Sequence, residues 1–220
     1  MHDDAHSLGD PSDRRLLAIA LSLTAAAIVV PAVGAGMSGS LALLAAAALL
    51  LAEASAPAIA LVSGIAASRP VEERTAARHR RAEVHATLGS AVVLTGLSVW
   101  IAGEGIRRLG APAEHPVDGG RMLLIAVVGL VATGIARRLS TPPRRGSRTV
   151  RGAQREVVGD LYGFVIVIAA AVLVWATGWA PADAFASLVL AAMILPRALV
   201  LLAQGFSALG EPARRRREHA

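Results

Sequence analysis

Three acidic residues interrupt the apolar stretches of this 220-residue chain, where a charged group needs a chemical reason. Glu53 is the only charge between Leu41 and Ala67, and Glu156 and Asp160 stand at the start of another long apolar run. Charged side chains within apolar, membrane-length segments are costly and are typical of ion pathways or substrate sites. Glu156 and Asp160 are four positions apart, so they share one helix face, about 6 Å apart along its axis.

The chemistry that suits these three carboxylates is reversible binding of a hard cation. Two stacked carboxylates repel each other unless a cation or a proton intervenes. If the two helices are neighbours, Glu53 supplies a third oxygen ligand, and such a site suits Mn²⁺, Mg²⁺, Fe²⁺ or Ca²⁺ better than Cu(I). A carboxylate that holds either a metal or a proton would couple cation export to proton entry. For Glu156, an ion pair with Arg151 or Arg155 at the membrane surface is an equal alternative.

The elements that must position these residues are membrane helices. The chain is 55% hydrophobic but only 3% aromatic, so its apolar mass is Ala, Leu, Val and Ile, which favours helices that face lipid and one another. It has no Cys, which excludes disulfides and thiolate metal sites. Apolar runs close to the spanning length of about 20 residues occur six times, at about 16–36, 41–67, 84–106, 122–135, 157–179 and 184–202.

We therefore predict an all-α membrane protein, a bundle of six transmembrane helices. Residues 1–13 are expected to form a cytoplasmic tail, residues 14–212 the membrane domain and residues 213–220 a basic cytoplasmic tail. Residues 179–183 are expected to form a tight turn before the last helix.

Arginine placement predicts the orientation of this bundle. All 22 basic residues are Arg, and most lie in segments that fall on one side of a six-span bundle. The other side carries only Arg107, Arg108 and Arg121. By the positive-inside rule, both termini are expected in the cytoplasm and the protein in the inner membrane. Topology thus explains the net charge of +6 without a nucleic-acid partner, and Arg197 in the last run is expected to extend to the cytoplasmic surface.

Other residues have simpler interpretations. Glu104 with Arg107 and Arg108 has the spacing of a salt-bridge cluster on a helix. Gly34, Gly36, Gly159 and Gly163 are interpreted as points of close helix packing. The chain has no Gly-rich phosphate loop, His-Glu-x-x-His motif or nucleophile elbow, so we expect no enzyme.

Several short motifs, taken in order, resemble the transmembrane domain of the cation diffusion facilitator family, six-helix exporters of zinc and other divalent metals. The resemblance covers most of residues 14–212 and implies proton-coupled efflux of zinc, manganese or a similar ion. It implies no tightly bound cofactor, and partners limited to the metal ion, the lipid bilayer and a second copy in a homodimer. The motifs are Ser40-Leu-Ala-Leu-Leu-Ala45, His79-Arg-Arg-Ala-Glu-Val84, Glu104-Gly-Ile-Arg-Arg-Leu-Gly-Ala-Pro112, Val150-Arg-Gly-Ala153 with Gly159-Asp160, and Gly178-Trp-Ala-Pro-Ala-Asp183.

The metal site departs from that family's pattern. The family holds its metal with His-x-x-x-Asp or Asp-x-x-x-Asp on the second helix and again on the fifth. Here these positions are Leu49-x-x-x-Glu53 and Glu156-x-x-x-Asp160, so only Asp160 matches outright and Leu49 cannot bind a metal. The expected cytoplasmic metal-binding domain has no counterpart in these residues. Three other positions at which the family commonly has a polar residue also differ in this chain. Ala46 stands where the family usually has Asp, and Ser90 and Thr133 stand where Asn is common.

Two main functions remain open at this point, beside a third and weaker one, the transport of a non-metal cation in exchange for protons. The first is a divalent cation transporter that exchanges its ion for protons and uses Glu53, Glu156 and Asp160 as metal ligands. The second is a degenerate relative that keeps the bundle without transporting and acts as a membrane partner or regulator. Leu49 and the smaller polar side chains motivate the second function.

Overall fold

Six helices make up the computed structural model, which describes residues 11–67, 73–111, 115–140 and 148–218. Side chains are described within residues 22–54, 84–111, 115–136, 138 and 162–207. No strand occurs among the described residues, which confirms the all-α class. The helices are α1 (Pro11–Ser38), α2 (Leu41–Ala67), α3 (Glu73–Gly110), α4 (Gly119–Ser140), α5 (Arg148–Thr177) and α6 (Pro181–Glu218).

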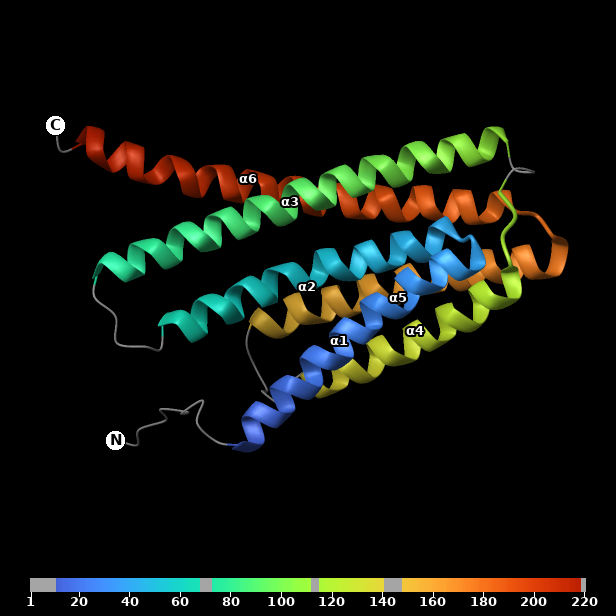
Figure 1. Ribbon diagram of the computed structural model, residues 1–220, viewed down its shortest axis with the longest axis horizontal. Coiled ribbons are helices and arrows are strands. Elements are labelled where there is room, and N and C mark those ends of the chain that lie inside the picture. Colours follow the sequence, from blue (N-terminus) through green and yellow to red (C-terminus); the bar gives the residue numbers. More distant parts are fainter. Residues whose placement is uncertain (1–10, 68–72, 112–114, 141–147, 219–220) are drawn as a thin grey trace.

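Helix α2 is the centre of the bundle, with contacts to α1, α3, α5 and α6. The long helices α3 and α6 lie side by side along one edge, and α1 and α4 pair on the other side (Figure 1). Helix α2 can approach so many neighbours because residues 42–48 are mostly alanine, and small side chains allow close helix contact. Helix α1 begins and α6 ends at the same end of the bundle, which we call the termini end; the opposite end is the distal end (Figure 1).

Three helices contain stretches long and apolar enough to cross a membrane: Val84–Gly110 in α3, Gly119–Ala136 in α4 and Pro181–Ser207 in α6. In the other three helices, the part with described side chains has shorter apolar stretches, Ser22–Ser38, Leu41–Ala54 and Tyr162–Thr177. Large apolar side chains point outward from the bundle, and such a surface is typical of contact with lipid or a partner. Examples are Val92, Val93, Trp100, Leu124 and Val165.

Two helices extend well beyond the apolar runs that predicted them. Helix α3 begins at Glu73, before the apolar run at 84–106, and α6 continues to Glu218, so most of the segment expected as a basic tail is helical. These additional helical segments, before the apolar run in α3 and after it in α6, are rich in Ala, Arg and Glu. These residues are strong helix formers, so the backbone is helical beyond the apolar sequence. The tight turn is also shorter than expected, because α6 already begins at Pro181.

Glycines mark the closest helix contacts. A Cβ added at Gly34 of α1 would lie 2.4 Å from a side-chain carbon of Ile125 in α4, which confirms the packing role expected for this glycine. The same expectation is wrong for Gly36, where nothing lies within 4 Å of an added Cβ. At Gly119, the first residue of α4, an added Cβ would lie 2.5 Å from the backbone nitrogen of Trp175 in α5. A backbone atom cannot rotate away as a side chain can, so a glycine is more strictly required at position 119 than at position 34.

Replacement of Gly119 by alanine should therefore destabilise the protein by about 1–3 kcal/mol through overpacking. Thermal unfolding of the purified protein in detergent would measure the loss. The matched control is Gly96→Ala in α3, where nothing lies within 4 Å of an added Cβ. An alanine in that helix interior is expected to be neutral or to stabilise by about 0.5–1 kcal/mol. Equal stability of the two variants would contradict the close contact.

Candidate functional site

The structure describes one of the three predicted metal ligands in full. Glu53 is buried on α2, with 7% of the residue exposed. Glu156 and Asp160 belong to α5, but their side chains lie outside the described residues. Helices α2 and α5 are in contact, which a site shared by Glu53 and the α5 carboxylates requires.

Three helices meet close to Glu53, at Leu49 of α2, Gly163 of α5 and Leu190 of α6. A Cβ added at Gly163 would lie 2.8 Å from Leu49 Cδ2 and 3.7 Å from Leu190 Cδ2. Leu49 is 2% exposed, so the position that holds the first ligand in the family pattern is filled by an apolar side chain packed on α5. A glycine at 163 is what allows this approach.

The sequence register places Glu53 and Asp160 on the same side of this meeting point. Helices α2 and α5 run in opposite directions, since α2 begins at the distal end and α5 finishes there (Figure 1). Glu53 follows Leu49 by four residues and Asp160 precedes Gly163 by three, so both positions are displaced toward the termini end. The displacements are about 6 Å and 4.5 Å along the two helices. The backbone thus places the two carboxylate-bearing positions at similar depth.

Arg197 of α6 forms an ion pair with Glu53, which the sequence did not predict. Its Nη1 donates to Glu53 Oε1, and the Glu53 side chain is 4% exposed while that of Arg197 is 36% exposed. The guanidinium of Arg197, which was expected to extend to the cytoplasmic surface, thus pairs with Glu53 while part of the side chain stays exposed. A buried carboxylate without a counter-charge is strongly destabilising, and α6 passes close enough to α2 to supply one.

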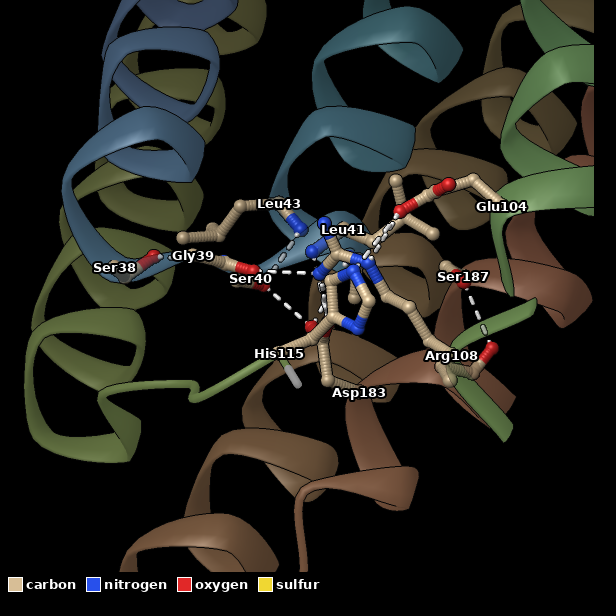
Figure 2. A network of polar contacts seen from close by, with 12 residues as sticks. Ser38, Gly39, Ser40, Leu41, Leu43, Glu104, Arg108, His115, Asp183 and Ser187 are labelled. Atoms are coloured by element: carbon tan, nitrogen blue, oxygen red, sulfur yellow. Dashed lines mark hydrogen bonds and ion pairs between the residues drawn. The ribbon is translucent and has the colours of Figure 1, made fainter. Parts of the chain in front are cut away.

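A second polar cluster lies at the distal end, around Asp183 in the first turn of α6 (Figure 2). Asp183 is 1% exposed and accepts hydrogen bonds from Ser40 Oγ (2.5 Å), Leu41 N (2.8 Å) and Ala42 N (3.1 Å). The first amides of a helix have no partner within the helix and favour a negative charge. Ser40 also accepts from Leu43 N (3.1 Å), which is ordinary N-capping. Asp183 thus joins the beginning of α6 to the beginning of α2.

Arg108 of α3 extends this cluster to a third helix. Its Nη1 lies 3.7 Å from Asp183 Oδ2 and donates to the carbonyl of Gly39 at 2.7 Å, while its Nε donates to Glu104 at 3.0 Å. Glu104 also pairs with Arg107 at 2.8 Å, so the predicted salt-bridge cluster is confirmed. We call Ser40, Glu104, Arg108 and Asp183 the distal cluster. Together with Arg107, its two carboxylates face two guanidinium groups, so it suits a structural link better than a cation site.

Sequence reasoning missed the role of the distal cluster, although its members carry local signals. Ser40 stands directly before an apolar run, as an N-cap does, and Asp183 follows Pro181 in a first helical turn. Neither signal shows that the two residues bond to each other across 143 positions. Among the side chains that the structure describes, no three of His, Cys, Asp and Glu gather as a metal site, and Thr133 Oγ1 is buried without a hydrogen-bond partner.

Comparison with known proteins connects this architecture to metal export. The sequence model of the cation efflux transmembrane domain matches residues 17–209. The metal cation efflux system protein CzcD of Cupriavidus metallidurans is 35% identical over 207 residues, which are 94% of this chain and 65% of CzcD. The zinc transporter ZitB of Escherichia coli is 36% identical over 214 residues, 96% of this chain and 67% of ZitB.

A more distant relative is the cadmium, cobalt and zinc/H(+)-K(+) antiporter of Bacillus velezensis. It is 28% identical over 196 residues, which are 88% of this chain and 61% of that protein. The chain therefore spans about two thirds of the length of the curated relatives that it matches.

Proposed function

This chain belongs to the cation efflux family, and on that premise we propose that it exports a divalent metal cation across the cytoplasmic membrane in exchange for protons. The observation that carries the proposal is a buried carboxylate, Glu53, on the central helix α2, which contacts the helix that bears Glu156 and Asp160. The relatives named as zinc and metal cation transporters support the substrate class.

In this proposal Glu53, Glu156 and Asp160 bind the ion, and α2 and α5 hold them at similar depth. Zinc commonly takes four ligands with imidazole or thiolate among them. Leu49 removes one ligand and Glu156 replaces another, so the remaining oxygen set favours a harder ion such as Mn²⁺ over Zn²⁺. Protons that enter from the far side would compete for the same oxygens and drive release.

The proposed topology is a six-span bundle with both ends in the cytoplasm. Its support is the alternation of the six helices between the two ends, with α1 beginning and α6 ending together (Figure 1). The Arg-rich beginning of α3 and end of α6 also lie at the termini end (Figure 1), which suits the cytoplasmic side. The distal cluster then faces the outside.

Transport in proteoliposomes with an imposed pH gradient would test the site. Glu53→Gln and Asp160→Asn should each lower metal uptake at least about tenfold, since loss of even an outer-sphere partner of a metal ligand lowers affinity or activity 10–100-fold. The control is Asp118→Asn, an exposed carboxylate paired with Arg121 at the distal end, which should transport normally. Undiminished uptake by both site variants would show that the ion does not use these carboxylates.

A second function, that of a non-transporting membrane partner, is favoured by one observation. Leu49 is packed against Gly163, so the missing ligand is replaced by a well-fitted apolar contact. This function predicts no metal-dependent uptake by the wild-type protein with Zn²⁺, Mn²⁺, Fe²⁺, Co²⁺ or Cd²⁺. Uptake of any of these ions that depends on Glu53 would exclude it.

A further inference from the structure

The Glu53 carboxylate is already paired with a cationic side chain of the same protein. Arg197 reaches it from α6, and the pair lies next to the place where α2, α5 and α6 meet. We propose that Arg197 is a tethered competitor of the transported metal: its guanidinium neutralises Glu53 in the metal-free state, and the metal displaces it on binding. The inference rests on the proposed use of Glu53 as a ligand.

The exposures of the two side chains indicate which partner moves. The Glu53 side chain is 4% exposed and enclosed by the bundle, whereas the Arg197 side chain is 36% exposed. Arginine has a long, flexible stem, and its guanidinium is more weakly hydrated than an ammonium group and pairs readily with carboxylates. Arg197 can therefore withdraw along the open side of α6 while Glu53 stays in place.

Charge balance explains why such a competitor would be useful. Without Arg197, the metal-free site would bury the negative charge of Glu53 on a helix that contacts α5, which carries two further carboxyl groups. Loss of one partner from a buried ion pair is strongly destabilising. A divalent ion supplies the compensating charge when it binds, and Arg197 supplies it when the ion leaves. The returning guanidinium thus favours release, which a transporter needs as much as binding.

A tethered competitor has a measurable consequence for affinity. Metal binds only to the fraction of molecules in which Glu53 is free, so the apparent dissociation constant equals the intrinsic constant divided by that fraction. If Arg197 occupies Glu53 in about nine molecules of ten, removal of its charge tightens binding about tenfold. A residue that merely positions Glu53 predicts the opposite, because its loss would weaken binding.

The experiment is Mn²⁺ binding to the purified full-length protein in detergent, measured by titration calorimetry. Arg197→Gln keeps a hydrogen-bond donor without the charge, and Arg197→Met removes both. Each should bind Mn²⁺ about tenfold more tightly than the wild type, whereas Arg197→Lys, which keeps a charge, should not. The gain should disappear in the double variant Glu53→Gln/Arg197→Gln. Unchanged or weaker binding in both neutral variants would overturn the inference.

A measurement on the wild-type side chain covers the case in which the neutral variants do not fold. With ¹⁵N-labelled arginine, the Nε–H signal of Arg197, assigned by its loss in Arg197→Lys, should shift when Zn²⁺ is added. The shift should be lost in Glu53→Gln. An Arg197 signal that does not respond to saturating Zn²⁺ would overturn the inference.

The binding result also separates this inference from the proposed function. A wild-type protein that does not transport, but whose Arg197→Gln variant gains Glu53-dependent binding, would support the inference and contradict transport. A wild-type protein that transports, with neutral variants that bind no more tightly, would overturn the inference alone. Absence of binding in every variant would overturn both.

Discussion

Asp183→Asn is expected to lower the free energy of unfolding by about 3–5 kcal/mol, the range typical of removing one partner from a buried charged pair. The carboxylate is 1% exposed and accepts three hydrogen bonds, two through Oδ1 and one through Oδ2, opposite Arg108. An asparagine must point its NH₂ group at one of these donors, and it removes one of the two carboxylates, Asp183 and Glu104, that pair with the Arg108 guanidinium. The start of α2 would lose part of its cap at the same time.

Thermal unfolding in detergent, followed by far-UV circular dichroism, would measure this loss. For a chain of this length, about 3–5 kcal/mol corresponds to a fall in Tm of roughly 6–20 °C. The control is again Asp118→Asn, an acidic side chain at the same end of the bundle, 46% exposed, whose ion pair with Arg121 is a surface one. The free energy of unfolding of this control variant should fall by less than about 1 kcal/mol. If both variants unfold at the same temperature, the distal cluster is not a structural link.

The contrast between Asp183 and Glu53 shows what the sequence could reveal about the site. Both are acidic residues in apolar surroundings, yet the sequence drew attention to Glu53 because no other charge stands near it. Asp183 follows a proline in a first turn and looked like part of a turn. What distinguishes them is the partner of each carboxylate, Ser40 for Asp183 and Arg197 for Glu53. These partners lie 143 and 144 positions away in the sequence, so the pairing depends on how the helices are arranged.

The family and the all-α architecture could be predicted because they depend on repeated local features. Long apolar runs separated by Arg-rich segments indicate helices in a membrane, and the motifs at the helix ends indicated the family, which the comparison confirms. Helix ends were less predictable. A helix stops where its backbone loses hydrogen-bond partners rather than where its sequence becomes polar, so α3 and α6 continue into Arg-rich sequence.

Pairings between distant helices could not be predicted at all. The sequence left open whether the helix with Glu53 is a neighbour of the helix with Asp160; the structure brings α2 and α5 together at Leu49 and Gly163. It also adds Arg197, which had been expected to extend to the cytoplasmic surface. Periodicity identifies the face of a helix on which a residue lies, but not which helix covers that face.

Leu49→His is expected to raise the affinity of the proposed metal site for zinc. Histidine at this position would lie four residues before Glu53, so the two side chains share a helix face, as metal-binding pairs on helices do. Leu49 packs on α5 at Gly163, so the imidazole would enter the contact between the two helices that carry the proposed ligands. Zinc prefers imidazole to an all-oxygen set, and we expect its affinity to rise at least about a hundredfold.

The same substitution should destabilise the metal-free protein, because it places a polar ring where an apolar side chain was 2% exposed. Zinc should then restore stability, since a ligand that binds only the folded state stabilises by about 2.7 kcal/mol at 100 times its dissociation constant. The matched control is Leu43→His, a fully buried position on the same helix near the distal end. It should be destabilised without any recovery in zinc.

Titration calorimetry and the zinc-dependent rise in Tm would decide the outcome, and a third variant identifies the site. Glu53→Gln added to Leu49→His should remove most of the gain in affinity, because the new ligand would then lack its partner on the same helix face. If Leu49→His and Leu43→His respond to zinc alike, position 49 does not face a metal site. The apolar contact at Leu49 would then be a packing feature of this bundle rather than a lost ligand.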